Sequence, residues 1–217
     1  MHFHIITIFP EMFDSYIHES IIARAIKNKK ISVSIYNPRD LSKDKHKKVD
    51  DTPYGGGPGM VMSVDPIVCA IKKAQQKIAR RKKSKIKIIM TSPSGKELTN
   101  EYSEKLLKNK YTDVVIICGR YEGIDARVKK IFRAEDVSIG NYVLTGGELP
   151  AMIMVDVISR RIPGVLGNIE SLEENRVSSS ETYTRPEIYK YDGKEYKVPK
   201  VLLSGHHKKI EEWKKSK

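Results

Sequence analysis

Cysteines and long apolar runs are scarce in this chain, and each scarcity excludes a class of protein. The two cysteines, Cys69 and Cys118, stand in apolar surroundings and form no metal-binding or redox pattern. No stretch approaches the ~20 apolar residues of a membrane span, and the start lacks the basic region and cleavage site of a signal peptide. We therefore expect a soluble cytoplasmic protein with no membrane partner and no metal site.

The signatures of phosphate and dinucleotide binding are also missing. No G-x-x-x-x-G-K-[ST] motif occurs, and the glycine-rich segment 55–60 follows a loop, whereas a Walker motif follows a strand. No G-x-G-x-x-G opens a helix with an acidic residue about 20 positions further on. These absences argue against an ordinary dinucleotide fold and disfavour a nicotinamide-dependent enzyme.

Basic residues, in contrast, are abundant. The chain has 40 Lys and Arg against 27 Asp and Glu, a formal net charge of +13. Such an excess favours a polyanionic partner, and segments 43–48 and 77–87 concentrate it. A genome biased toward lysine and isoleucine would also raise the charge, and net charge alone does not choose between RNA, DNA and acidic lipid.

Hydrophobic periodicity predicts alternating strands and helices. A stripe formed by Phe13, Ile17, Ile21 and Ala25 predicts one helix within 10–30. Segment 43–59 has no usable period and is expected to be a long functional loop. The alternation predicts an α/β fold with a largely parallel sheet flanked by helices. The expected strands are 3–9, 31–37, 86–90, 113–118 and 135–140, and the other expected helices are 64–83, 98–109, 123–132 and 147–161.

The composition changes after residue 166. Segment 167–180 has few apolar residues and three consecutive serines, which is typical of a flexible linker. Segment 181–217 is short and basic, and it contains a predicted helix around Trp213. We therefore expect a main domain over 1–166, a linker over 167–180 and a small, shortened C-terminal helical domain over 181–217.

Three loops leave the carboxyl ends of predicted strands, where parallel sheets bind ligands. They span residues 91–96, 119–123 and 140–150, and all contain glycine. Glycine lets the main chain approach a ligand and present its amides and carbonyls. One such turn would be unremarkable, but three at one edge predict a site of main chain and apolar side chains, suited to a flat purine with a small polar chain.

Seven ordered motifs carry a family resemblance. They are FPEMF, VDDTPYGGGPGM, CGRYEGID, SIGNYVLTGGELPA, RIPGVLG, YTRPE and VLLSGHH. In this order they closely resemble the bacterial tRNA (guanine-N1)-methyltransferases of the knotted SPOUT superfamily, over residues 1 to about 210. The resemblance implies a deep trefoil knot between about residues 86 and 160, tRNA as substrate, and a homodimer whose active sites draw on both chains.

The resemblance also implies S-adenosylmethionine as methyl donor, held in a bent form by the knot walls. Mg²⁺ is neither required nor excluded by these residues. By matching motif positions, the expected cofactor contacts are Ser92, Pro93, Gly119, Tyr121, Glu122, Ile139, Gly140, Asn141, Tyr142, Val143, Leu144, Gly146, Gly147 and Pro150.

The implied reaction methylates N1 of the guanosine immediately 3′ of the anticodon, position 37. It needs a base at N1 and a cation at O6, and Arg160 matches the family's cation. The family's general-base aspartate aligns with Asn175, whose neutral amide cannot accept a proton. Glu174 or Glu173, one or two residues earlier, is the candidate substitute. The alternative is a catalytically weakened relative that binds tRNA and cofactor.

Three further residues are expected to meet RNA. Asp50 and Tyr54 lie in the kept loop motif VDDTPYGGG, and Arg185 lies in YTRPE. The family usually continues for a few dozen residues beyond the Trp213 helix with a basic segment. The resemblance therefore implies a shortened C-terminus in this chain and puts its tRNA affinity in doubt.

Overall fold

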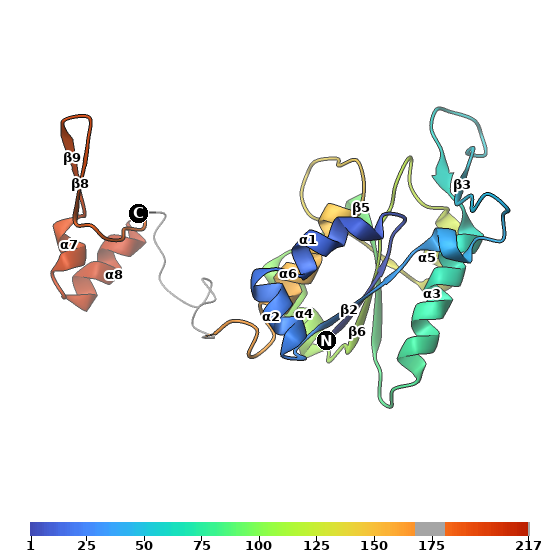
Figure 1. Cartoon of the computed structure of the whole chain (residues 1–217), viewed down its shortest axis with the longest axis horizontal. Coiled ribbons are helices and arrows are strands. Elements are labelled where there is room, and N and C mark those ends of the chain that lie inside the picture. Colours follow the sequence, from blue (N-terminus) through green and yellow to red (C-terminus); the bar gives the residue numbers. More distant parts are fainter. Residues whose placement is uncertain (168–180, 217) are drawn as a thin grey trace. The chain divides into compact units, whose positions relative to one another are not determined.

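The computed structural model describes residues 1–167 and 181–216. The chain divides into two compact units, residues 1–167 and 168–217, which are coloured from blue to orange and in red in Figure 1. We call them the N-terminal unit and the C-terminal unit and describe each by itself. Except for Gly167, the predicted linker 167–180 lies outside the described residues.

A five-stranded sheet forms the centre of the N-terminal unit, with strand order β2-β1-β6-β5-β7. Every neighbouring pair is parallel, which confirms the predicted parallel sheet. All five strands therefore end at the same edge. Their bounds are β1 (His2–Ile6), β2 (Ser32–Tyr36), β5 (Ile86–Glu97), β6 (Asp113–Ile117) and β7 (Glu135–Ser138).

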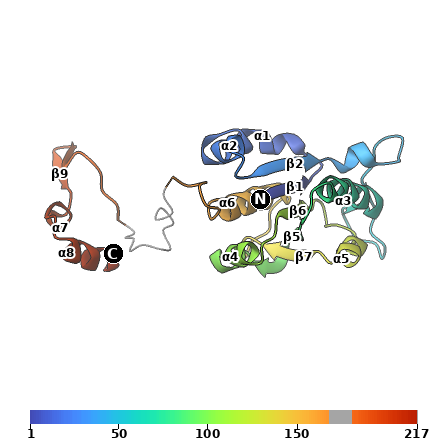
Figure 2. The same cartoon turned by 90° about the horizontal axis from the view of Figure 1, so that it is seen from below.

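Helices cover both faces of this sheet, because alternate residues of the central strands point to opposite sides. On β6, Val114 and Ile116 belong to one apolar core, whereas Val115 and Ile117 belong to the other. Figure 2 shows α1, α2, α4 and α6 on one face and α3 and α5 on the other. Their bounds are α1 (Asp14–Ile17), α2 (Ser20–Lys27), α3 (Val64–Ala79), α4 (Asn100–Lys108), α5 (Ala126–Phe132) and α6 (Glu148–Ser159).

The single helix predicted within 10–30 is wrong. The segment forms the 3-10 helix η1 (Pro10–Phe13), then α1, and then α2 after a break. Ser20 has a φ of +52°, which a continuous right-handed helix does not contain. The break rotates the following turn, so that Ile22 is buried where the spacing predicted Ile21. Contact with the sheet therefore outweighed local periodicity.

The predicted turn 91–96 is a detour within β5. Thr91 and Lys96 both pair with Val137 of β7, so the residues between them leave the ladder and return to it. A Cβ on Gly95 would lie 2.5 Å from the backbone carbon of Asp136. Glycine is required there because the loop presses directly on the neighbouring strand. The loop predicted over 43–59 contains the two-residue strand β3 (Asp50–Asp51), which pairs with β4 (Val61–Met62).

After β7 the chain returns toward the middle of the sheet. Gly147 donates a backbone hydrogen bond to the carbonyl of Gly119, 2.8 Å away, beyond the end of β6. Helix α6 then starts and packs on the face that carries α4 and η1. Its Asp156 accepts a hydrogen bond from Tyr16 of α1. The returning chain therefore passes between the exit of β6 and the N-terminal segment.

The C-terminal unit contains a hairpin of β8 (Ile188–Tyr191) and β9 (Lys194–Lys197), then α7 (Lys200–Leu203) and α8 (His207–Lys215). The helix predicted around Trp213 is confirmed, and Tyr183 packs against that ring at 6.2 Å. The hairpin was not predicted. Asp192 and Gly193, with φ of +47° and +71°, form its turn, and this Asp-Gly pair was the available signal.

Among the described residues, no helix combines the length and apolar character needed to cross a membrane.

Candidate active site

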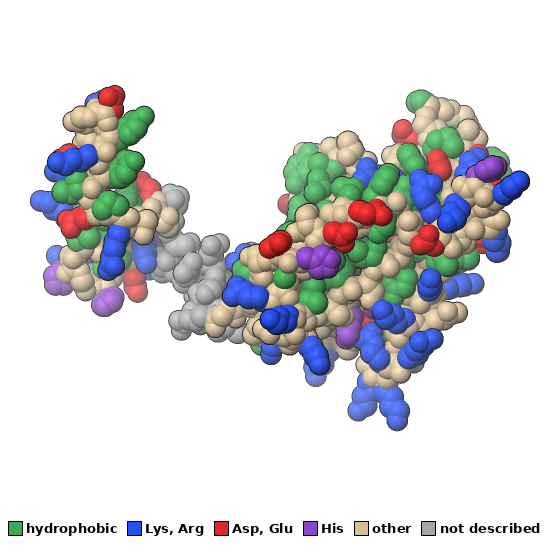
Figure 3. Space-filling model, in the orientation of Figure 1, with side chains coloured by type: hydrophobic (Ala, Val, Ile, Leu, Met, Phe, Trp, Pro, Cys, Tyr) green, Lys and Arg blue, Asp and Glu red, His purple; other side chains and the backbone are tan. Residues whose placement is uncertain are grey.

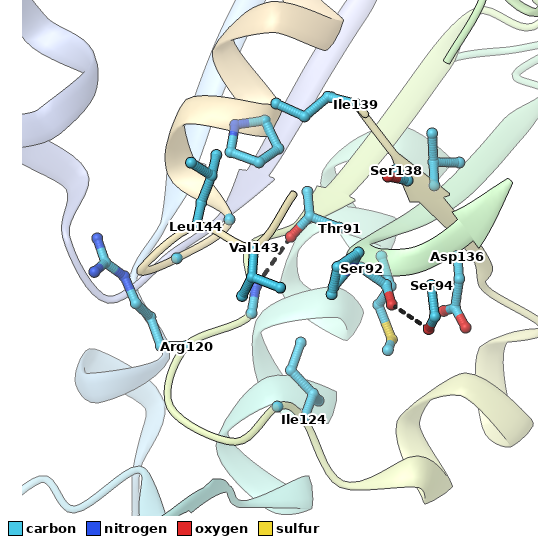
Figure 4. Close-up of a pocket in the computed structure, with 18 of the residues that line it drawn as sticks. Thr91, Ser92, Ser94, Arg120, Ile124, Asp136, Ser138, Ile139, Val143 and Leu144 are labelled. Carbon is cyan, nitrogen blue, oxygen red and sulfur yellow. Dashed lines mark hydrogen bonds between the residues drawn. The ribbon is translucent and has the colours of Figure 1, made fainter. Parts of the chain in front are cut away.

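A cavity of about 470 Å³ opens at the carboxyl ends of β5, β6 and β7. Its walls are the three loops that leave these strands, and Figure 4 shows their side chains facing a common space. The loop after β5 contributes Ser92 and Ser94, joined by a 3.1 Å hydrogen bond between their hydroxyl groups. The parallel sheet therefore brings together segments that lie up to 60 residues apart in the sequence.

Most of the predicted cofactor residues line this cavity. They are Ser92, Pro93, Gly119, Tyr121, Glu122, Ile139, Tyr142, Val143, Leu144, Gly146, Gly147 and Pro150. Gly140 and Asn141 belong to the same loop but do not line the cavity. Sequence reasoning missed other lining residues that flank these motifs, namely Met90, Thr91, Ser94, Arg120, Gly123, Ile124, Asp136, Val137, Ser138 and Thr145.

Crowding at Gly147 shows how tightly the returning chain fits. A Cβ there would lie 2.0 Å from Oγ1 of Thr91, 2.7 Å from the amide nitrogen of Gly119 and 2.8 Å from Cα of Cys118. Oγ1 of Thr91 also accepts a hydrogen bond from the Gly119 amide at 3.2 Å. The loops after β5 and β6 and the start of α6 are thus locked together at one point on the cavity floor.

A buried ion pair, missed from the sequence, fixes the same junction. Oε2 of Glu148, a fully buried residue, accepts a 2.8 Å hydrogen bond from Nε of Arg120. Its Oε1 accepts another, also 2.8 Å, from the hydroxyl of Thr7 at the end of β1. The Arg120 guanidinium lies over the ring of Phe9, 4.6 Å from its centre. Both residues occur inside the quoted motifs, which gave no sign that they would meet.

The loop after β7 gives the cavity an apolar wall. Val143 is 81% exposed and Leu144 39% exposed, although both line a concave surface. Exposed apolar side chains around a pocket are typical of ligand sites, because a flat ring can cover them. Cys118 beneath the floor is not a nucleophile candidate, since burial raises the pKa of its thiol and keeps it neutral.

Arg160, the one predicted catalytic residue that the structure describes, does not line this cavity. Arg160 caps the far end of α6, ten residues beyond Pro150, which corresponds to about 15 Å along a helix. Glu173, Glu174 and Asn175 lie outside the described residues.

The predicted RNA-contact residues divide between the two units. The loop containing Asp50 and Tyr54 adjoins the cavity rim, where the Glu122 amide donates to the Met60 carbonyl at 3.0 Å. Tyr54 at its tip is fully exposed, and Asp50 is half-buried in β3. Arg185 is exposed in the C-terminal unit. The structure thus brings the base of the loop that carries the first two to the cavity rim and places Arg185 in the other unit.

Within residues 1–167 and 181–216, no three His, Cys, Asp or Glu side chains form a group that could hold a metal ion.

Comparisons with known proteins agree with this architecture. The family described as tRNA (Guanine-1)-methyltransferase TrmD matches residues 1–217. A tRNA (guanine-N(1)-)-methyltransferase of Ruminiclostridium cellulolyticum is 48% identical over 98% of this chain and 89% of its own length. One from Buchnera aphidicola is also 48% identical, over 97% of this chain and 86% of its own.

The crystal structure of a tRNA (m1G37) methyltransferase from Aquifex aeolicus superposes with a TM-score of 0.79 at 38% identity. It covers 100% of this chain and 88% of that one. This likeness confirms the predicted fold class, the knotted α/β fold of the SPOUT superfamily, and explains why the chain after β7 passes back through the loop region. The chain belongs to the tRNA (guanine-N1)-methyltransferase family.

Proposed function

We propose that this protein transfers a methyl group from S-adenosylmethionine to N1 of the guanosine immediately 3′ of the anticodon, position 37, in tRNA. The observation that carries the proposal is the cavity of glycine-rich strand-exit loops, found in a chain of this family. The relatives' names and their high coverage favour an active enzyme over the catalytically weakened alternative.

The cavity fits the methyl donor in size and in chemistry. Its volume of about 470 Å³ lies within the range of small-molecule sites. Val143 and Leu144 offer an apolar surface to an adenine ring, and the close-packed turn at Gly119 brings main chain to the wall. When bound, S-adenosylmethionine supplies an electrophilic methyl group on a sulfonium.

The protein's own residues must remove the proton from N1 of the guanine and stabilise the charge that develops on O6. Neutral guanine carries a proton on N1, so a base must accept it while the new N1–carbon bond forms and the sulfur–carbon bond breaks. Negative charge then develops on O6 as the proton leaves. A guanidinium placed near O6 stabilises that charge, and we assign this role to Arg160.

We propose that the active form is a homodimer with composite sites. Arg160 lies about 15 Å along α6 from the cavity of its own chain, so a second copy is the source that can deliver it. Helix α6 also keeps large apolar side chains on its free side, with Leu149 and Ile153 51% and 40% exposed. An apolar helix face of this kind needs a partner surface.

We propose Glu174 or Glu173 as the general base. The amide of Asn175 cannot accept a proton, whereas a carboxylate one or two residues earlier can.

Asp50, Tyr54 and Arg185 are proposed to contact the tRNA, with Tyr54 exposed and free to stack on a base. A tRNA substrate and the reduced cysteines support a cytoplasmic location.

The test is methyl transfer from labelled S-adenosylmethionine to tRNA with guanosine at position 37, against the same tRNA with adenosine there. We expect turnover only with guanosine, a loss on the order of 100-fold in Arg160→Ala, and loss in one of Glu173→Gln or Glu174→Gln. Turnover retained in both glutamine variants excludes them as the base. Tight cofactor binding without turnover supports the weakened alternative, and adding Mg²⁺ or EDTA decides whether the ion assists.

The composite site has its own test. Mixing Arg160→Ala chains with chains that cannot bind cofactor should restore part of the activity, because one of the two sites in the mixed dimer is intact. Sedimentation should show a dimer, and a monomer with full activity contradicts the proposal.

A further inference from the structure

The opposite edge of the sheet carries an unusual concentration of positive charge. Strands β2, β5 and β6 are preceded by segments 27–31, 80–85 and 108–112, which contain no Asp or Glu. The first and last of these loop segments each begin with the final residue of a helix, Lys27 of α2 and Lys108 of α4. We call the exposed cations of all three segments the basic edge. It consists of Lys27, Lys29, Lys30, Arg80, Lys82, Lys83, Lys85, Lys108 and Lys110.

These loops form one continuous surface. The Met1 ammonium donates to the Lys30 carbonyl at 3.2 Å, and the Thr112 amide donates to the Lys85 carbonyl at 3.0 Å. Nζ of Lys85 donates to the Asn109 carbonyl at 2.9 Å. Figure 3 shows Lys and Arg side chains gathered along the lower edge of the N-terminal unit. The cations therefore act on a ligand as a group.

Three of these lysines occupy backbone positions that favour glycine. Lys29, Lys83 and Lys110 have φ of +55°, +63° and +55°, and all three are exposed. Lys29 and Lys110 follow α2 and α4 in the turn that commonly ends a helix with glycine. There the amide of the next residue bonds back five residues, from Lys30 to Ala25 and from Tyr111 to Leu106.

Helix ends explain only part of this pattern. A cation near a helix C-terminus is favoured by the helix dipole, and that accounts for a basic residue in the last turn. It does not require lysine in the left-handed conformation, where a Cβ is strained. Clustered cations also repel one another and destabilise the compact state, although Lys108 is partly compensated by its 3.1 Å ion pair with Glu104. Both costs are offset when a polyanion binds.

We propose that the basic edge binds the phosphate backbone of double-stranded RNA, as a second RNA surface separate from the methyl-transfer cavity. From β2 to β5 the edge crosses three strand spacings, about 15 Å, enough for several phosphates. It lies about 17 Å from the cavity, the length of β5 from Ile86 to Thr91. The choice of RNA among polyanions rests on the proposed function.

A membrane surface fits the basic edge less well. Interfacial segments combine cations with apolar side chains that insert between lipids. The apolar residues of these loops, Ile31 and Tyr111, are buried and half-buried, and Lys85 lies over the Tyr111 ring at 4.8 Å. The edge therefore offers charge without an apolar anchor.

The test is the triple variant Lys29→Gly, Lys83→Gly and Lys110→Gly in the full chain. The probe is a 16-base-pair RNA duplex without loops, bound over a range of salt concentrations. We expect affinity to fall about tenfold at 0.15 M salt and the slope of log K against log salt to drop by about 3. The midpoint of thermal unfolding should rise, because glycine relieves the strain.

Two controls separate charge from conformation. Lys29→Arg, Lys83→Arg and Lys110→Arg keep the charge and should keep duplex affinity. Arg24→Gln, Lys130→Gln and Lys208→Gln remove the same total charge from exposed positions on α2, α5 and α8, and should leave the affinity within about twofold.

Three outcomes would overturn the proposal. They are unchanged duplex affinity in the glycine triple, an equal loss in the scattered triple, and tighter binding to vesicles of anionic lipid than to the duplex. The proposed function is tested separately, by measuring methyl transfer to a short anticodon stem-loop. The glycine triple should methylate it at the wild-type rate, and an inactive wild-type protein would instead refute the proposed function.

Discussion

The two edges of the central sheet use unusual backbone in opposite ways. At the carboxyl edge, Gly147 has an ordinary φ of −86°, yet neighbouring backbone would lie within 3 Å of a Cβ. At the amino edge, Lys83 and Lys110 adopt left-handed φ in open, exposed turns. Crowding makes glycine obligatory, whereas a positive φ alone makes it only favourable.

This difference matches the two ligands that we propose for the sheet. At the carboxyl edge, main-chain segments pack directly against one another around a small cavity. Glycine is needed at the floor of this cavity because a side chain would not fit between the segments. At the amino edge, long lysine side chains extend into solvent, and three of these lysines have a strained left-handed backbone. One sheet therefore supports a close-packed small-molecule site and an open charged surface.

The largest effect is expected at the carboxyl edge, from a substitution that breaks the buried ion pair between Arg120 and Glu148. Glu148→Gln leaves the Arg120 guanidinium, whose side chain is only 16% exposed, without its charged partner. We expect a loss of about 3–5 kcal/mol in the free energy of unfolding, measured in urea, together with loss of cofactor binding. Lys108→Gln, which removes an exposed pair with Glu104, should cost less than about 0.5 kcal/mol. Equal effects would contradict the structure.

The next effect tests crowding directly. Gly147→Ala should lower the free energy of unfolding by about 2–3 kcal/mol, because its methyl group meets the backbone of Gly119 and Cys118. Gly167→Ala is the matched control, since nothing lies within 4 Å of a Cβ there. It should change stability by no more than about 0.5 kcal/mol. A tolerated Gly147→Ala would show that the returning chain fits loosely.

A smaller effect of opposite sign is expected at the amino edge. Lys110→Gly removes about 1–2 kcal/mol of backbone strain from the left-handed conformation. It also makes the unfolded chain more flexible, which lowers stability by about 0.4–1 kcal/mol. The net expectation is a gain of about 0.5–1 kcal/mol in chemical denaturation. A loss of stability would mean that the helix dipole outweighs strain at this turn.

The smallest effect concerns a buried polar network beneath the amino edge. Nε2 of His4 lies 2.9 Å from Oδ1 of Asp113, and Nδ1 lies 3.0 Å from the Tyr36 hydroxyl. Arg81 also pairs with Asp113. Burial lowers the pKa of His4, although its contact with Asp113 opposes the shift. The pKa of His4 is therefore lower in the folded than in the unfolded chain, and between these two pKa values the residue takes up a proton on unfolding.

Stability should accordingly fall as pH drops from about 6.5 toward the folded pKa of His4. His4→Gln should make the stability difference between pH 7.5 and 5.5 smaller than in the wild type, as measured by urea unfolding at each pH. Some slope will persist, since burial also lowers the pKa of His2. An unchanged slope would mean that His4 does not change protonation on unfolding in this range.

The sequence allowed much of the fold to be predicted because its signals are local. Five strands, the helix over 64–79 and the glycine-rich exits of β5, β6 and β7 follow from periodicity and turn residues. Local signals failed where distant contacts prevail, as at the break before Ser20 and in the detour of β5. They also gave no indication that Arg120 would meet Glu148.

By itself, the sequence determined the alternation of strands and helices, the glycine-rich edge, the excess of positive charge and, through its motifs, the family. Only the tertiary structure decided that Gly147 lies against Gly119, that Arg160 lies far along α6 from its own cavity, and that three lysine-bearing turns share one edge. The physical reason is that propensity acts over a few residues, whereas strand order and chain threading bring together residues that no local pattern connects.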